Sequence, residues 1–582
     1  MAPIEPPAGR FLAAVEAAEQ STPLPPPPPP APDQNDPRYL RDPQAYERDR
    51  LAVEQTRANF AAAARLRGGA IGQLLSDRLK NAPLAMLQEL LDAPADQVPI
   101  FAPVIGPAIV ARRQYVLTCL TRDDLFTVDP YAAKMARGMD DPARASGALS
   151  HFLLSTDDEA LYRPDDVLLR SVITSDDADR LTRTTRTEAE RWASRLRDVG
   201  ELDVVSTLAR MVPLRIVGNY LGVPWSDQDT PAPLPGLRGG DTFPLDDDLV
   251  KVFTFNRITA GVVPTEDQLF DWIKDVFRDV FNNFGPPTRQ SVDFTERGLE
   301  ATEYLTAYIH ALLIHHRSQL REGEDVPDTM LTRLLRLQLR VAAEGDERLC
   351  AALGPALPPG TAAARLSDSM IRSNVLGTVV GAVVNPQEAT ARIVDSLLRL
   401  QDGEYPVRNG SSYLAAVAAA RTDEDAPGYA ESLRTVRRYS LEALRLRPQG
   451  EVLLRRCVRD NTELGGVLIR AGTLVFVGYA GAMRDPMDVP EPLAFDASRD
   501  PQPYGYLRTT DRAREAEQSR LYLQHGFGRH KCLGRYASEI TMQESARALL
   551  RLGGLARLSE LEMDEQNLYA VRLRIGVGED PR

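Results

Sequence analysis

Residues 525–534, HGFGRHKCLG, place a single cysteine behind glycines and basic side chains. Glycines such as Gly528 and Gly534 allow tight backbone conformations and let a flat ligand approach closely. The basic residues before Cys532 include His530, which offers a hydrogen-bond donor and favours a thiolate over a thiol. This combination indicates a thiolate that binds the iron of a haem ring as its axial ligand.

A helix is expected directly after this loop. The run RYASEITMQESARALLRL, which begins at Arg535, has helical spacing, so Cys532 would lie near a helix N-terminus, where the dipole favours an anionic sulfur. Two other interpretations of the loop stay open: Cys532 is a buried apolar residue, or it shares a zinc ion with His525 and His530. Zinc is the weaker one, because no second cluster of Cys or His with ligand spacing occurs in the sequence.

The loop resembles the haem-binding signature of the cytochrome P450 superfamily, an aromatic residue followed by Gly-x-Gly-x-His/Arg-x-Cys-x-Gly. The chain matches it at Gly526, Gly528, His530, Cys532 and Gly534, with His525 in place of the aromatic residue. The resemblance implies a cytochrome P450-like fold, mainly α with small β-sheets, and haem b (iron protoporphyrin IX) as cofactor. It also implies Cys532 as the axial iron ligand, with Phe527 and the matching glycines and histidine around the cofactor.

Glu442 and Arg445 lie three residues apart in SLEALRLRPQG on a predicted helix, where their side chains can pair. The spacing alone says little, because Glu431 and Arg434 share it and an exposed pair contributes only about 0.3 kcal/mol. The setting distinguishes Glu442. An Arg-Pro break follows, and residues 451–486 alternate β-branched runs with Gly-containing turns, which predicts strands of a small sheet.

This order resembles the family's K helix and the strands after it. The segment FDASR, which ends at Arg499, resembles the family's meander, whose arginine joins the Glu-x-x-Arg pair in a buried network behind the haem. We therefore expect Glu442, Arg445 and Arg499 to be structural, because buried charges are tolerable only when they are fully paired.

The resemblance assigns contacts with the haem propionates to two arginines. Arg456 falls where the family places an arginine on a propionate. Residues 162–170, YRPDDVLLR, resemble the start of the C helix, where a His-x-x-x-Arg pair commonly contacts the propionates. Arg170 is retained, whereas Asp166 stands at the histidine position, so one donor is missing or comes from elsewhere.

Residues 366–400 resemble the long I helix, which crosses over the haem. In oxygen-activating members its middle carries a Gly/Ala pair, then an acid and a threonine that relay protons. Here Gly381 and Ala382 take the small-residue positions, while Val384 and Asn385 stand in place of the acid and the threonine. We expect Gly381, Ala382 and Asn385 to be the residues of the catalytic site.

This departure changes the expected chemistry. Cleaving the O–O bond of dioxygen requires delivered protons, and neither a valine nor an asparagine amide supplies them. Asparagine here resembles the branches that isomerise or dehydrate fatty-acid hydroperoxides, in which the substrate brings its own O–O bond. We expect a haem-thiolate oxidoreductase that acts on an apolar, fatty-acid-like or otherwise lipophilic, small molecule and uses a peroxide or substrate hydroperoxide. Pro386 follows Asn385 directly and should kink the helix.

Two alternatives stay open. The first is a dioxygen-dependent monooxygenase, since some family members lack the threonine and still hydroxylate. Such an enzyme would take electrons from a separate ferredoxin and reductase, because the sequence shows no flavin or nicotinamide motif. The second is a catalytically degenerate haem-binding protein that assists another enzyme.

The composition of the chain limits the classes of partner and the location that are expected. A net charge of −13 argues against nucleic acid and anionic membranes as main partners. Four scattered cysteines in 582 residues do not form a disulfide framework, which predicts a reducing, cytoplasmic location. No apolar run approaches the ~20 residues of a membrane span.

The chain divides into three parts. Residues 1–37 form a proline-rich, flexible extension, in which six consecutive prolines favour polyproline II. Residues 38–95 form a helical extension, and residues 96–582 form the haem domain. Within it, residues 114–131 predict a strand followed by a short helical piece, and the aromatic stretch 252–285 predicts a lid over an apolar pocket.

Overall fold

The structure is a computed structural model, and the parts of the chain that it describes are mainly helical with small β-sheets, as the sequence predicts. It describes residues 11–578 except 34–35, 37, 40–41, 93–99, 103–105, 136–151, 227–262, 285–287, 355–356, 500–520 and 566. Part of the aromatic stretch 252–285, namely 252–262 and 285, therefore lies outside the described residues.

The helices that the structure describes are α1 (Phe11–Ser21), α3 (Pro43–Asn81), α4 (Pro83–Leu91), α5 (Arg113–Thr121), α6 (Asp129–Met135), α7 (Glu159–Val172), α8 (Ala178–Val199), α9 (Leu208–Ile216), α12 (Glu266–Phe277), α13 (Arg289–Glu322), α14 (Met330–Glu344), α15 (Asp346–Leu353), α16 (Ala362–Arg365), α17 (Asp368–Gln401), α18 (Tyr413–Ala420), α19 (Tyr429–Leu446), α20 (Tyr479–Ala482) and α22 (Arg535–Leu550). Short π-helical segments continue α9 (Val217–Leu221) and α12 (Arg278–Asn282).

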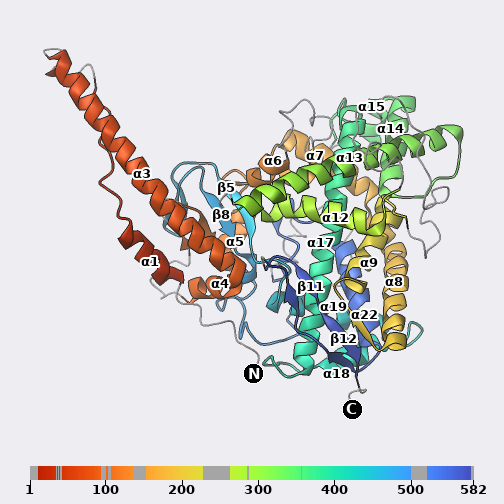
Figure 1. Ribbon diagram of the computed structural model, residues 1–582. Helices are drawn as coiled ribbons and strands as arrows, with labels where there is room; N and C mark the ends of the chain where they lie inside the picture. The colour runs from red at the N-terminus through yellow and green to blue at the C-terminus, as the bar shows by residue number, and fades with distance from the viewer. Residues whose placement is uncertain are drawn as a thin grey trace.

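Helix α17 runs through the centre of the molecule, with α9, α12, α13, α19 and α22 packed around it (Figure 1). Most residues of α17 are buried, and they lie on several sides of the helix because neighbouring helices surround it. It continues without interruption through Pro386, although proline removes one N–H from the hydrogen-bond ladder. The central position places the middle of α17 inside the molecule.

Small sheets lie at two edges of the helical body. The larger sheet has the strand order β1-β2-β8-β5-β3, formed by β1 (Ile100–Phe101), β2 (Ala108–Val110), β3 (Phe126–Thr127), β5 (Leu453–Cys457) and β8 (Leu474–Val477). Only β2 and β8 pair in parallel in this sheet. Strands β6 (Thr462–Leu464) and β7 (Val467–Ile469) form a hairpin between β5 and β8, so the predicted strands of residues 451–486 are present.

A second group of strands lies near the C-terminus. Strands β4 (Glu201–Asp203), β12 (Arg574–Val577) and β9 (Leu555–Arg557) form a three-stranded antiparallel sheet, and β10 (Glu562–Met563) pairs with β11 (Ala570–Arg572). The β10–β11 hairpin reaches back to α17, because the Ala570 N–H donates to Glu388.

Residues 114–131 contain a sheet strand and a helical piece as predicted, but in the other order: helix α5 comes first, and strand β3 follows it. Residues 113–121 form α5, in which Val116, Cys119 and Leu120 are buried on one face. Spacings of three and four residues between buried side chains follow a helical period, and β-branched content alone did not distinguish it from a strand.

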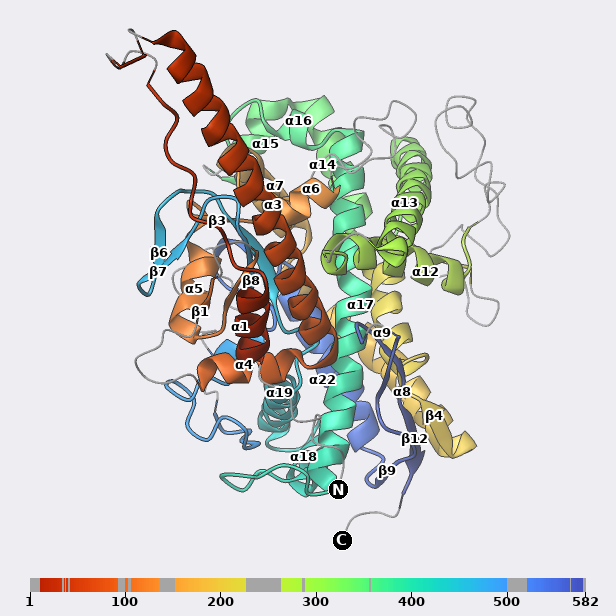
Figure 2. The ribbon, with the colours of Figure 1, turned by 60° about the vertical axis from the view of Figure 1, so that its left-hand side comes forward.

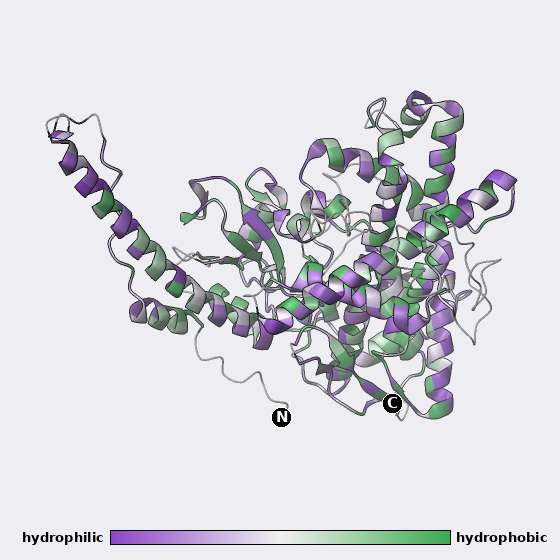
Figure 3. Cartoon of the chain, turned by 45° about the horizontal axis from the view of Figure 1, so that its top comes forward, coloured by the Kyte–Doolittle hydropathy of each residue, from purple (hydrophilic) through white to green (hydrophobic). Residues whose placement is uncertain are grey.

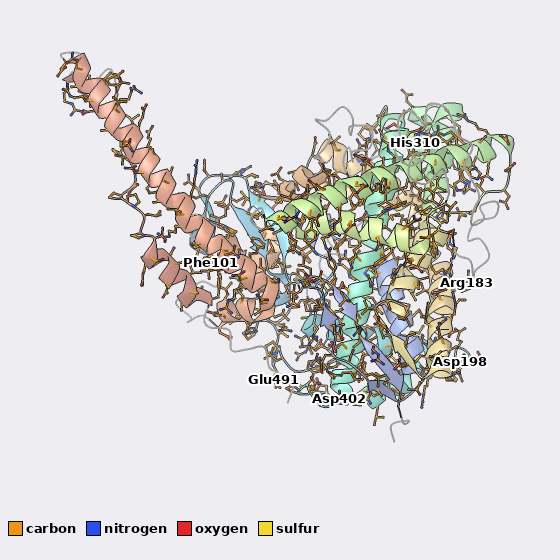
Figure 4. All side chains as sticks on the ribbon, viewed as in Figure 1. Phe101, Arg183, Asp198, His310, Asp402 and Glu491 are labelled. Carbon is orange, nitrogen blue, oxygen red and sulfur yellow. The ribbon has the colours of Figure 1, made fainter. Side chains whose placement is uncertain are left out.

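The N-terminal helices pack as an arm against the larger sheet (Figures 1 and 2). Phe11 and Val15 of α1 are buried, and the carboxylate of Glu89 accepts hydrogen bonds from the N–H groups of Phe11 and Leu12. Phe11 also meets Phe101, which lies where the arm joins the body (Figure 4). Residues 11–21 are thus anchored, whereas the sequence predicts a flexible extension there; the three-part division itself stays a prediction.

The far half of α3 projects beyond the body and mixes polar and apolar residues around its surface (Figure 3). In the described residues, none of the helices is both long enough and apolar enough to cross a membrane.

Candidate functional site

The loop before α22 carries Cys532. Gly528 has φ +72°, and a Cβ at this position would lie 2.5 Å from the Leu120 carbonyl oxygen, so only glycine fits there. The Cys532 N–H donates to the His525 carbonyl at 2.9 Å, which closes the loop. Helix α22 begins at Arg535, and Cys532 therefore lies just before a helix N-terminus.

The Cys532 side chain is partly exposed, whereas the other three cysteines of the chain are buried. Burial raises the pKa of the Cys532 thiol, and the Gly534 N–H, Arg535, Lys531 and Arg170 act against this rise. A thiol in this setting needs a further positive partner, such as a metal ion, to become a thiolate.

His525 and His530 each lie beside a different carboxylate. Nδ1 of His525 lies 3.8 Å from Glu539, and burial lowers the pKa of His525 to about 4. Nε2 of His530 lies 2.8 Å from Asp157. Among the described residues, the group with metal-ligand spacing is Asp123, Asp157 and His530, without Cys532. The structure therefore does not bring the two histidines and Cys532 together as zinc ligands.

Behind the loop, the structure brings Glu442, Arg445 and Arg499 together. Glu442 and Arg445 are both fully buried on α19 and form a two-pronged ion pair at 2.8 Å. Nε of Arg499 lies 3.3 Å from Glu442 Oε1, and Tyr522 donates to the other carboxylate oxygen. The arginines also donate to backbone carbonyls, those of Met483, Pro492 and Ala494 for Arg445 and those of Pro490, Glu491 and Ala494 for Arg499.

Arg456 does not reach the interior. Its guanidinium binds Asp129 at the surface at 2.7 Å, and the adjacent Arg455 is only 3% exposed. Neighbouring residues of a strand point to opposite faces of a sheet, so only one of the two arginines on β5 can face inward. The contact between Arg456 and a propionate stays a prediction, and the buried Arg455 is a second candidate: its pKa is lowered by burial, and it lies in the field of Asp123 and Asp157.

Helix α7 places Arg170 near Cys532, where its charge opposes the rise in the thiol pKa. Asp166, one turn earlier, binds Arg170 at 2.8 Å and so neutralises part of this charge. The aromatic ring of Tyr162 on α7 packs edge-on against His530, and its hydroxyl donates to the Arg529 carbonyl. The edge of α7 therefore offers Tyr162 and Arg170 to the Cys532 loop.

The middle of α17 adjoins an open space. Gly381 and Asn385 are exposed and Ala382 is partly exposed, although the helix crosses the centre of the molecule. A Cβ added at Gly381 would meet no atom within 4 Å. Val384, three residues after Gly381, is buried in a hydrophobic cluster that also contains Leu533, the neighbour of Cys532. The exposed turn and the Cys532 loop thus border one core region.

Comparison with known proteins supports this geometry. Residues 433–551, from α19 to α22, match the family model "Cytochrome P450". The described chain has the cytochrome P450 fold. A cytochrome P450 from Chondromyces apiculatus, CYP109Q5, has the same fold, with a TM-score of 0.55 at 16% identity over 86% of this chain and 96% of that one. P450BioI bound to an acyl carrier protein carrying hexadec-9Z-enoic acid gives a TM-score of 0.57 at 15% identity, over 86% of this chain and 99% of that one.

Curated relatives match the chain over shorter segments. Cyclooctat-9-en-7-ol 5-monooxygenase of Streptomyces melanosporofaciens is 36% identical over 113 residues, which are 19% of this chain and 22% of the relative. A bifunctional dioxygenase–epoxy alcohol synthase of Pyricularia oryzae is 27% identical over 209 residues, 35% of this chain and 16% of the relative. The chain therefore matches about a fifth of these relatives or less.

The residues of this site fit a haem. Nε of Arg455, Nδ1 of His530 and Nε of Arg529 are buried and have no hydrogen-bond partner in the described part of the chain. Buried donors without a partner, two of them on the Cys532 loop, suit a ligand that carries carboxylates. The sequence reasoning missed Arg455, Tyr162 and Asp157; only the in–out alternation of β5 could have signalled Arg455, and no sequence pattern marks the other two.

Proposed function

We propose that the protein is a haem-thiolate oxidoreductase, with Cys532 as the axial iron ligand, acting on a lipophilic small molecule. One observation carries this proposal: the only partly exposed cysteine of the chain lies in a loop whose Leu533 belongs to the same core cluster as Val384, on the turn of α17 that carries the exposed Gly381 and Asn385. Similarity to the cytochrome P450 family supports a haem cofactor, and we propose that it is haem b.

The residues of the chain have separable tasks in this proposal. Gly534, Lys531 and Arg535 favour a negative Cys532 sulfur through the N–H and two nearby charges. Arg455 and His530 offer buried donors for the cofactor's carboxylates. When bound, haem supplies oxidising chemistry at its iron.

The exposed turn of α17 lies on the side of the proposed haem site opposite Cys532. Gly381 and Ala382 leave room above a flat ligand, because neither carries a side chain larger than a methyl group. The Asn385 amide faces the same open space and can hold a substrate oxygen by a hydrogen bond, which contributes ~1 kcal/mol net.

The proposed substrate is apolar because the elements around this region supply aliphatic and aromatic side chains. Phe270, Phe277 and Val380 belong to the same hydrophobic cluster as Val384 and Leu533. The names of the relatives, a cyclooctat-9-en-7-ol 5-monooxygenase and a bifunctional dioxygenase–epoxy alcohol synthase, agree with a lipophilic substrate. Electrons, where needed, come from a separate ferredoxin and reductase.

Two oxidants compete in this proposal. Monooxygenation with dioxygen is favoured by the monooxygenase name of the Streptomyces relative. Use of a hydroperoxide is favoured by Val384 and Asn385, which replace the proton-relaying pair of the family, and by the epoxy alcohol synthase relative. A haem-binding protein without activity of its own is the outcome if neither oxidant gives turnover.

A spectrum tests the proposal first. The ferrous–carbon monoxide complex of the purified chain should show a thiolate-type Soret band, and Cys532→Ser should remove it. A chain without that band, or a variant that keeps it, contradicts the proposal. Stopped-flow mixing with a fatty-acid hydroperoxide, in the absence of reductant, then separates the oxidants: turnover supports the hydroperoxide, and turnover only with NAD(P)H and redox partners supports dioxygen.

A further inference from the structure

Glu388 is an acid that none of the assignments above uses. It lies on α17 four residues after Val384 and three after Asn385, so all three lie within one turn of the helix. Residues four apart share a helix face, and Glu388 therefore extends the face on which Val384 cannot carry a proton. Its side chain is buried, at 3% exposure.

The two carboxylate oxygens of Glu388 have different surroundings. Oε1 accepts the Ala570 N–H at 2.6 Å. Oε2 is buried without a hydrogen-bond partner in the described residues, and Nε of Arg392 lies 3.6 Å away. An unpartnered buried carboxylate oxygen costs free energy, whereas a protonated one is neutral. The ion pair with Arg392 offsets this cost only in part, because no hydrogen bond forms across the 3.6 Å between Nε and Oε2; burial therefore favours a proton on Oε2.

Charged groups face Glu388 from every element packed against it. Arg392 comes from α17, Lys274 from α12, and Asp564 from the segment that leads into β11. Asp564 is bound to Arg278 at 3.0 Å, and the rings of Tyr569 and Phe270 lie under the Lys274 ammonium. The described residues show no carboxylate within 4 Å of Lys274, so neither the acid nor the amine is held in a direct ion pair with the other.

The balance of these effects leaves Glu388 titratable near neutrality. Burial raises the pKa of Glu388 to about 7, and Arg392, the Ala570 N–H and Lys274 only partly oppose this rise. General acids act most efficiently when their pKa lies near the working pH.

We propose that Glu388 holds and releases the proton that the residue at position 384 cannot, and so supplies protons to the open space beside Asn385. This inference rests on the proposed function. In the step, the O–H bond at Glu388 Oε2 breaks and a water molecule beside Asn385 takes the proton. The carboxylate then regains a proton from solvent water, so no net charge accumulates. No oxidant or reductant enters this step.

This proposal bears on the choice of oxidant. A buried acid one turn from the exposed amide restores the proton supply that dioxygen cleavage needs, whereas a hydroperoxide brings its O–O bond already formed. Glu388 therefore favours monooxygenation over the hydroperoxide route that Val384 and Asn385 alone indicate.

Infrared spectroscopy of the full chain tests whether the carboxyl titrates. In pH-difference spectra, wild-type protein should lose one protonated-carboxyl C=O band as the pH rises through about 7. Glu388→Gln should lack this band. Glu431→Gln, an exposed acid on α19, should keep it and serves as the matched control. If Glu388→Gln removes no band, the proposal is overturned.

Turnover of the holoenzyme with its redox partners tests whether the proton is used. Glu388→Gln should lower the share of electrons that end in product by about 100-fold, since general acids contribute roughly 10²–10⁴. The wild-type rate should fall as the pH rises through about 7, because the protonated form is lost, and the variant should show no such decline. Glu388→Asp, which keeps a carboxyl group, should recover part of the yield.

A structural role would give a different result. Both variants would then lose haem content or melting temperature together, and the pH profile of the remaining activity would not change; that result overturns the proposal. A wild-type chain without the thiolate-type carbon monoxide band contradicts the proposed function. A chain that has the band but keeps its product yield in Glu388→Gln contradicts only this inference.

Discussion

The Cys532 loop with the network behind it and the exposed turn of α17 border the same core region but are built differently. Behind the loop, Glu442 and Arg445 are fully buried and their polar atoms are paired with side chains and backbone carbonyls. On α17, Gly381 and Asn385 face open space, and Glu388 keeps an unpartnered oxygen. Buried paired charges are constrained by folding, whereas a helix keeps its backbone with almost any side chain facing open space. The two regions can therefore change independently, and chemistry can vary on α17 while the loop stays fixed.

The largest effect is expected for Cys532→Ser, because a serine hydroxyl does not ionise near neutral pH and cannot replace a thiolate ligand. The thiolate-type Soret band of the carbon monoxide complex and all turnover should disappear. Cys350→Ser is the matched control, since Cys350 lies buried on α15 and donates to Asp346 and Pro358, which a hydroxyl can also do. If both variants lose the band, the loss reflects folding and not ligation.

The next largest effect tests whether the network behind the loop is structural. Glu442→Gln leaves Arg445 buried without its counter-charge and should lower the free energy of unfolding by about 3–5 kcal/mol. Glu431→Gln breaks a Glu–Arg pair of the same spacing on the exposed part of α19 and should cost only about 0.3 kcal/mol. Chemical denaturation of both variants measures the difference, and similar losses would contradict the division between buried and exposed pairs.

A third effect separates the two arginines of β5. Arg455→Gln removes a buried donor and should raise the rate of haem dissociation by about tenfold or more, because hydrogen bonds to charged groups contribute about 1.5–3 kcal/mol. Arg456→Gln breaks only the surface pair with Asp129, which is worth about 0–1 kcal/mol, and should leave the rate nearly unchanged. Transfer of haem to an excess of apomyoglobin measures both rates. A larger increase of the rate in Arg456→Gln than in Arg455→Gln would support Arg456 as the propionate contact.

The fold class and the Cys532 loop could be predicted because both depend on local patterns. Helical spacing after the loop, the break after Arg445 and the turn-rich strands are each visible within a few residues. The sequence alone could not choose between Arg455 and Arg456, because a shift of one residue along a strand moves every side chain to the other face. The order of helix and strand within residues 114–131 could not be predicted, because a short apolar run does not distinguish the two periods.

Glu388 could not be found from the sequence. Its burial depends on Ala570 and Lys274, which lie far along the chain in either direction, and its spacing from Val384 alone predicts only an acid on a helix. The pairing of His530 with Asp157 has the same origin, since the two residues are 373 apart. Such features arise from tertiary contacts between segments that carry no shared local pattern.

The smallest effect concerns the Asn385 amide. Asn385→Val removes one hydrogen bond of ~1 kcal/mol to a substrate oxygen, so turnover with a fatty-acid hydroperoxide should fall about fivefold. Thr378→Val, one turn before Gly381, removes a hydroxyl that donates to the Asn374 carbonyl and is the control for a polar group lost from the same helix. Stopped-flow rates with saturating hydroperoxide measure both variants. A fivefold loss that appears with hydroperoxide and is absent in NADPH-driven turnover would show that Asn385 acts on a preformed O–O bond. An equal loss in both would show that the amide only positions the substrate, and would leave proton supply to Glu388.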